Sequence, residues 1–326
     1  MQDYLQTSLP ISGRTCSVRQ IIMRVEVNRH TLLEIAGDYE AAMGWIAAIG
    51  FPVERGRLAE YRSTITELSK NFETDGWGNL DDKIHRERVC TTLFEIRELV
   101  SIYRGLSSLT EPDATKGLQH YVKGPFSPIS ELASNSSNRA RNLGFELYLN
   151  ALFAFAGFRP TYATNADLSF THRGQTFFVE AKRPTNQTTA AGSIKDANKQ
   201  LSSRLKQLNN HHARGLIALD LTKVINPESR VMPVFSEDHL YELMFNEDKR
   251  QIDELRSHWH SSRHTRTIGV LIHYRMLTNF TETGALNTLK WIGFVMFRDE
   301  PSLSEINKKL GGSNSAGLLK LLPTTA

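Results

Sequence analysis

The sequence predicts an α/β protein in which a central mixed β-sheet is flanked by helices and preceded by an α-helical N-terminal domain. Apolar residues recur at helical spacing between residues 31 and 107, whereas from residue 139 onwards helical segments alternate with short runs typical of strands. We therefore expect a helical domain over residues 1–135, a sheet domain over residues 136–300 and a C-terminal tail over residues 301–326.

The N-terminal half is predicted to be helical after a partly ordered leader of about 25 residues that shows no regular period. Apolar side chains line one face of three segments, residues 31–47, 56–72 and 80–106, and each is predicted to be a helix. The stretch from 107 to 138 contains three prolines and a Ser/Asn run, which is typical of a linker. The domain boundary is therefore predicted near residue 135.

The C-terminal half begins with a predicted helix over residues 139–156, ended by Gly157 and Pro160. Arg173-Gly174 joins two strand-like runs, so residues 167–182 are predicted to form a β-hairpin. The pattern Ser193-x-x-Asp196 indicates a capping box and a helix over residues 193–210. We also expect strands over residues 158–164, 216–221, 267–273 and 291–297, and a helix over 237–259.

Composition excludes several classes of protein. Hydrophobic residues make up 40% of the chain and charged residues 23%, as in ordinary globular proteins. No apolar run is long enough to span a bilayer and the N-terminus does not resemble a signal peptide, so we expect a cytoplasmic protein that does not insert into membranes. The two cysteines, Cys16 and Cys90, have no metal-binding spacing and predict neither disulfides nor a zinc site.

Acidic and basic residues are predicted to meet at one edge of the sheet. Side chains alternate along a strand, so Phe178, Glu180 and Lys182 share one face. Pairing of the two hairpin strands would bring Asp167 close to Glu180. Two adjacent carboxylates repel each other unless a cation neutralises them, and oxygen ligands suit Mg²⁺.

This arrangement resembles the PD-(D/E)XK nuclease superfamily, whose restriction-endonuclease-like core carries an acid on one strand and (D/E)-x-K on the next. Asp167 matches the first acid and Glu180-Ala181-Lys182 the second part. Further matches are Glu146 on the preceding helix and Gln200 on the following helix. The resemblance covers about residues 139–222 and departs from the family at Asn165-Ala166, where a proline is frequent.

The resemblance implies a metal-dependent phosphodiesterase, and within that class a DNA endonuclease of restriction or antiphage defence. Asp167, Glu180 and the carbonyl of Ala181 would hold Mg²⁺, for which Mn²⁺ can substitute, and Glu146 would bind a second ion or a water. Lys182 would help to deprotonate the attacking water or stabilise developing charge. Gln200 would supply a polar group to the site.

A nucleic-acid partner is indicated by seven basic residues against one acidic residue between positions 181 and 215, although the net charge is only +4. Phosphate contacts are expected from Lys195, Lys199, Arg204 and Lys206. DNA is the preferred polymer and RNA the second candidate. A homodimer would allow both strands to be cut, and the N-terminal domain is the expected place for an effector or partner protein.

Two other interpretations stay open at this point. In the first, the chain is a non-catalytic nucleic-acid-binding protein that kept the fold and lost metal-dependent turnover. In the second, the match is fortuitous and a helical interaction module precedes an unrelated α/β domain. Metal-dependent DNA cleavage would support the nuclease, and DNA binding without cleavage would support the non-catalytic protein. Absence of nucleic-acid binding even at low salt would support the fortuitous match.

Overall fold

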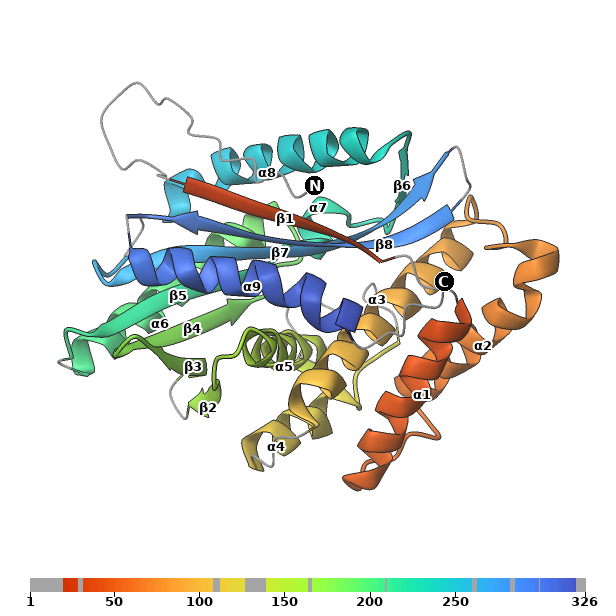
Figure 1. The fold of residues 1–326 in the computed structure, drawn as a ribbon, viewed down its shortest axis with the longest axis horizontal. Helices are drawn as coiled ribbons and strands as arrows, with labels where there is room; N and C mark the ends of the chain where they lie inside the picture. Colours follow the sequence, from red (N-terminus) through yellow and green to blue (C-terminus); the bar gives the residue numbers. More distant parts are fainter. Residues whose placement is uncertain are drawn as a thin grey trace.

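The computed structural model describes residues 20–28, 32–107, 112–126, 139–163, 166–208, 210–259, 263–281, 285–298 and 300–320. These form an eight-stranded mixed sheet with helices on both faces, which confirms the predicted α/β class (Figure 1). The strands are β1 (Gln20–Asn28), β2 (Thr161–Ala163), β3 (Ala166–His172), β4 (Gln175–Lys182), β5 (Ala213–Asp220), β6 (Val231–Val234), β7 (Thr267–Phe280) and β8 (Ala285–Met296). The helices are α1 (Leu32–Ala48), α2 (Arg57–Asp75), α3 (Lys83–Leu106), α4 (Pro112–Tyr121), α5 (Arg139–Phe155), α6 (Gln187–Gln207), α7 (Thr222–Ile225), α8 (Glu237–Trp259) and α9 (Pro301–Lys320).

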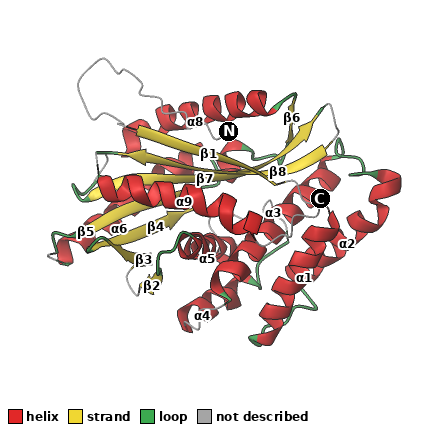
Figure 2. Cartoon of the chain, viewed as in Figure 1, coloured by secondary structure: helices red, strands yellow, loops and turns green. Residues whose placement is uncertain are grey.

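The sheet combines two antiparallel ends with a parallel centre. Its strand order is β1-β8-β7-β5-β4-β3-β2, and β6 pairs with β7 off this path (Figure 2). β2, β3 and β4 are antiparallel neighbours, β4, β5 and β7 run parallel, and β7, β8 and β1 are antiparallel. Parallel neighbours need a crossover, and α6 supplies the one between β4 and β5.

Each face of the sheet has its own hydrophobic cluster. α5 and α9 cover one face, and α6 and α8 cover the other. On β4, Phe177 and Val179 point to the first cluster, while Phe178 packs on the second. This alternation places Glu180 and Lys182 on the α6 side of the sheet.

The N-terminal helices share the first cluster. Buried side chains of α1, α2 and α3 belong to the same hydrophobic cluster as α5 and the adjacent face of the sheet. Gly105 of α3 lies against Ala151 of α5 so closely that a Cβ on Gly105 would be 2.5 Å from the Ala151 Cβ. The predicted domain border near residue 135 and the Ser/Asn run over 134–138 lie outside the described residues.

Two terminal segments differ from the sequence-based expectation. The predicted leader includes a strand, β1, which pairs antiparallel with β8 along its whole length. The predicted C-terminal tail contains α9, which buries Leu303, Ile306 and Leu310 in the first cluster. Those three side chains recur at helical spacing, whereas β1 depends on a partner strand more than 250 residues away in the chain.

One helix was not predicted, and the start of another was predicted wrongly. The expected linker contains α4, which starts at Pro112, a residue well suited to the first helical position. α6 begins at Gln187 instead of residue 193, because Asn186 and Thr189 form the capping box. The Thr189 N–H donates to Asn186 Oδ1 at 2.9 Å, and the Asn186 N–H donates to Thr189 Oγ1 at 2.9 Å.

No helix in the described part of the chain is long and apolar enough to cross a membrane.

Candidate active site

A tight hairpin brings the predicted acids together. Arg173 and Gly174 both have positive φ, 49° and 72°, as a two-residue type I′ turn requires. The turn sets a register in which Leu168 is opposite Val179, so Asp167 lies beside Glu180 at the open end of the hairpin. The predicted hairpin and the proximity of the two carboxylates are thus confirmed.

The ammonium of Lys182 lies between the two carboxylates. Its Nζ is 3.4 Å from Glu180 Oε2 and 3.8 Å from Asp167 Oδ2. Asp167 Oδ2 also accepts a hydrogen bond from the Ala181 N–H at 2.7 Å, which fixes this carboxylate against the backbone of β4. One lysine therefore offsets part of the negative charge of both acids.

Glu180 has a second cationic partner, Arg204 of α6. The Arg204 guanidinium forms an ion pair with Glu180 Oε1 and lies 5.8 Å from the centre of the Phe178 ring. The Glu180 side chain is only 3% exposed. Burial raises the pKa of Glu180, and the charge of Asp167 raises it further, whereas Lys182 and Arg204 oppose the rise.

The fourth member of the group is Glu146, which lies on α5. It is partly buried, and this burial, followed by repulsion from Asp167, raises its pKa to about 8. The charge of Lys182 opposes that rise and the charge of Glu180 adds to it. The four side chains that influence one another here, Glu146, Asp167, Glu180 and Lys182, are called the acidic cluster below.

The donor chemistry of the acidic cluster suits a hard divalent cation. Mg²⁺ binds carboxylate oxygens and commonly uses only one or two of them, together with waters and substrate phosphates. Burial, followed by the charge of Asp167, raises the pKa of both Glu146 and Glu180. Among the described residues, however, no three His, Cys, Asp or Glu side chains are arranged to hold a metal ion by themselves. The ammonium of Lys182 lies where a cation would bridge Asp167 and Glu180.

The raised pKa of Glu146 predicts that replacing this residue changes the stability of the protein in a pH-dependent way. An acid whose folded-state pKa is raised costs stability once it ionises, so this cost grows as the pH rises from the ordinary value of 4.5 to about 8. In EDTA, Glu146→Gln is expected to be more stable than the wild type at pH 8.5 and to lose this advantage at pH 5. Urea unfolding at the two pH values measures the difference. The exposed Glu242→Gln variant is the control, and an equal effect at both pH values would contradict the prediction.

The basic residues of α6 divide into two groups. Lys195, Lys199 and Lys206 are exposed along one stripe of the helix. Arg204 is nine residues after Lys195, about two and a half turns, and so lies on the opposite side, where it pairs with Glu180. The three lysines are thus available to a polyanion but point away from the acidic cluster, whereas Arg204 belongs to it.

Gln200 lies one turn before Arg204 and is exposed. It occupies the same flank of α6 as Arg204. Asn165, where the sequence departs from the family pattern, lies outside the described residues.

Behind the acidic cluster is a buried polar group that sequence reasoning missed. Arg183 follows Lys182, and its Nε is 2.8 Å from Asp220 Oδ2. Asp220 Oδ1 accepts from the Thr222 N–H at 3.0 Å and faces His273 Nδ1 at 3.4 Å. Burial favours the neutral acid, but hydrogen bonding to His273 and the charge of Arg183 hold the pKa of Asp220 well below its usual range. The sequence signal for this group was the position of Asp220 at the end of a continuous apolar strand.

Comparisons with protein-family models, curated proteins and solved structures find no match to this chain.

Proposed function

We propose that the chain is a Mg²⁺-dependent nuclease that hydrolyses phosphodiester bonds, with DNA as the preferred substrate. The observation that carries the proposal is the meeting of Asp167, Glu180 and Lys182 at the end of β4. The two carboxylates would hold the cation, and the lysine within 4 Å of both is a group that can act on water or phosphate.

The order of elements around this group supports the proposal. α5, the antiparallel strands β2, β3 and β4, then α6 and the parallel strand β5 follow in the order that the resemblance to the PD-(D/E)XK superfamily implies. We propose on this basis that residues 139–222 belong to a restriction-endonuclease-like core. A role in restriction or antiphage defence rests on the resemblance alone.

In the proposed reaction, Asp167, Glu180 and the Ala181 carbonyl would hold Mg²⁺, and Glu146 would hold a second ion or a water. Bound Mg²⁺ would polarise the scissile phosphate and activate water. The hydrogen bond from the Ala181 N–H keeps Asp167 oriented, and Arg204 favours the ionised form of Glu180. Lys182 would orient the water and stabilise charge on the phosphate.

A cleavage assay tests the proposal. Purified wild-type and Lys182→Ala proteins are incubated with supercoiled plasmid, linear DNA and RNA in Mg²⁺, Mn²⁺ or EDTA. We expect wild-type cleavage that requires the metal and falls at least about 10²-fold in the variant, because a charge-stabilising group is lost. Lys70→Ala, at an exposed position on α2, is the matched control. The preferred substrate identifies the polymer and the mode of cleavage.

A specific observation favours a second candidate, a non-catalytic nucleic-acid-binding protein. Glu180 forms ion pairs with both Lys182 and Arg204, so two cationic side chains of the protein surround a carboxylate that would hold the metal. DNA retention by wild type and Lys182→Ala alike, with no cleavage of any substrate in either metal, would replace the first proposal by this one. Failure to bind nucleic acid even at low salt would overturn both.

A further inference from the structure

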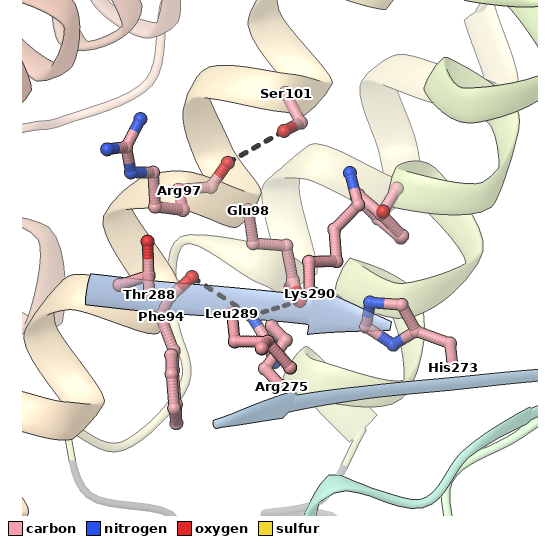
Figure 3. Close-up of a pocket in the computed structure, with 10 residues that line it drawn as sticks. Phe94, Arg97, Glu98, Ser101, His273, Arg275, Thr288, Leu289 and Lys290 are labelled. Atoms are coloured by element: carbon pink, nitrogen blue, oxygen red, sulfur yellow. Dashed lines mark hydrogen bonds and ion pairs between the residues drawn. The ribbon is translucent and has the colours of Figure 1, made fainter. Parts of the chain in front are cut away.

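A pocket separate from the acidic cluster lies between α3, α5 and the strands β7 and β8 (Figure 3). The pocket opens to solvent, and the space in it and at its mouth, open solvent included, is about 370 Å³. α3 contributes four lining residues, α5 contributes Tyr148, and the two strands contribute five. The lining residues are Phe94, Arg97, Glu98, Ser101, Tyr148, His273, Arg275, Thr288, Leu289 and Lys290.

Positive charge dominates the pocket. Arg275 and Lys290 are directly opposite each other on the antiparallel strands β7 and β8, an arrangement that costs stability when the charges are alike. Arg97 adds a third cation from α3. Glu98 Oε2 pairs with the Arg275 guanidinium at 3.0 Å, and burial raises the pKa of Glu98 to about 7, so this carboxylate is only partly ionised near neutral pH. Three cationic side chains and one carboxylate therefore line the pocket.

Two of the buried polar atoms in the lining that lack a hydrogen-bond partner among the described residues belong to uncharged side chains of β7 and β8. They are His273 Nε2 and Thr288 Oγ1, on residues that are 1% and 8% exposed. The Nδ1 atom of His273 faces Asp220, so we assign the ring proton to Nδ1, which leaves Nε2 as an acceptor. Burial lowers the pKa of His273 to about 4, so the ring is neutral at neutral pH. A buried polar atom without a partner is costly, and a ligand would remove that cost.

The remaining walls are apolar or aromatic. The aromatic side chains of Phe94 and Tyr148 line the pocket beside the cations, whereas the Leu289 side chain packs in the second cluster on the other face of the sheet. The Arg275 guanidinium lies 5.4 Å from the centre of the Phe94 ring, and the Lys290 ammonium lies 5.3 Å from the centre of the Tyr148 ring. A ligand suited to these walls combines an anionic group with a small carbon skeleton.

We propose that this pocket binds a small organic phosphomonoester that also carries a hydroxyl group. The phosphoryl group would lie among Arg97, Arg275 and Lys290, because a phosphate near its dianionic form accepts charge-assisted hydrogen bonds from arginine and lysine side chains. The Thr288 hydroxyl would donate to a phosphoryl oxygen, and the ligand hydroxyl would donate to His273 Nε2. The carbon skeleton would contact the ring of Phe94. The proposal does not depend on nuclease activity.

Calorimetric titration of the full chain tests this site, with glycerol 3-phosphate, inorganic phosphate, glycerol and succinate as probes. We expect glycerol 3-phosphate to bind the wild type more tightly than phosphate does, and glycerol not to bind. Lys290→Gln is expected to weaken glycerol 3-phosphate binding at least about tenfold. The exposed Lys70→Gln variant on α2 should bind as the wild type does.

A second variant separates loss of the site from loss of the fold. Thr288→Val keeps the side-chain shape, removes the orphaned hydroxyl from the buried strand, and is expected to weaken phosphomonoester binding several-fold while the thermal midpoint without ligand does not fall. Absence of glycerol 3-phosphate binding at millimolar concentration would overturn the proposal. Equal binding by Lys290→Gln, or preference for succinate, would overturn the assignment of the pocket to a phosphomonoester.

Discussion

Glu180→Gln is expected to abolish metal-dependent cleavage, with a rate at least about 10³-fold below the wild type, which corresponds to about 4 kcal/mol of transition-state stabilisation. Glutamine keeps the size of the side chain and an oxygen that can accept from Arg204, but it removes the charge that would attract the cation. Asp167→Asn is expected to act in the same direction. The measurement is the initial rate of plasmid cleavage at saturating Mg²⁺.

The fold of the Glu180→Gln variant should survive. Burial and Asp167 raise the pKa of Glu180, so the ionised carboxylate lowers the stability of the folded state and a neutral replacement relieves that cost. Equal far-ultraviolet circular dichroism and an unchanged or higher thermal midpoint would show that lost activity comes from the site. Cleavage by Glu180→Gln at the wild-type rate would remove Glu180 from the mechanism.

Glu95→Gln is expected to lower the free energy of unfolding by about 3–5 kcal/mol, the largest effect on stability that the structure predicts. Glu95 of α3 is 2% exposed and holds two buried arginines. Its Oε1 is 3.0 Å from Arg141 Nε, and its Oε2 is 3.6 Å from Arg57 Nη1. Removing its charge leaves two guanidinium groups inside the protein without their carboxylate.

A surface pair provides the matched control for Glu95. Glu67 forms an ion pair with Arg88 at 2.7 Å, but both side chains are at least 38% exposed. Glu67→Gln is therefore expected to cost less than about 1 kcal/mol in the same urea titration. Comparable losses in the two variants would contradict the assignment of Glu95 as the centre of the interior charge network.

The pH dependence of Glu95 has the opposite sign to that of Glu146. Burial alone would raise the pKa of Glu95, but Arg141 and Arg57 lower it to about 2 from the ordinary 4.5. The stabilisation is therefore present above pH 4.5 and is lost as the pH falls towards 2. Wild-type stability should fall more steeply than that of Glu95→Gln across this acidic range.

The acidic cluster shows which features of the site can be predicted from local sequence patterns. Arg173-Gly174 has the chemistry of a two-residue turn, and the alternation along residues 175–182 places Glu180 and Lys182 on one face. The proximity of Asp167 follows from that register alone. The α/β class followed in the same way from the periodicity of long segments, because each helix or strand carries its own pattern.

The sequence by itself thus determined the fold class, the hairpin and the pairing of Asp167 with Glu180 and Lys182. Only the tertiary structure decided that β1 joins the sheet through β8, that Arg204 turns to Glu180 and away from the lysine stripe, and that Arg275 and Lys290 meet in a pocket. The first group depends on neighbours a few residues apart, whose geometry the backbone dictates. The second depends on contacts between segments distant in the chain, which form only when sheet order and helix packing bring those segments together.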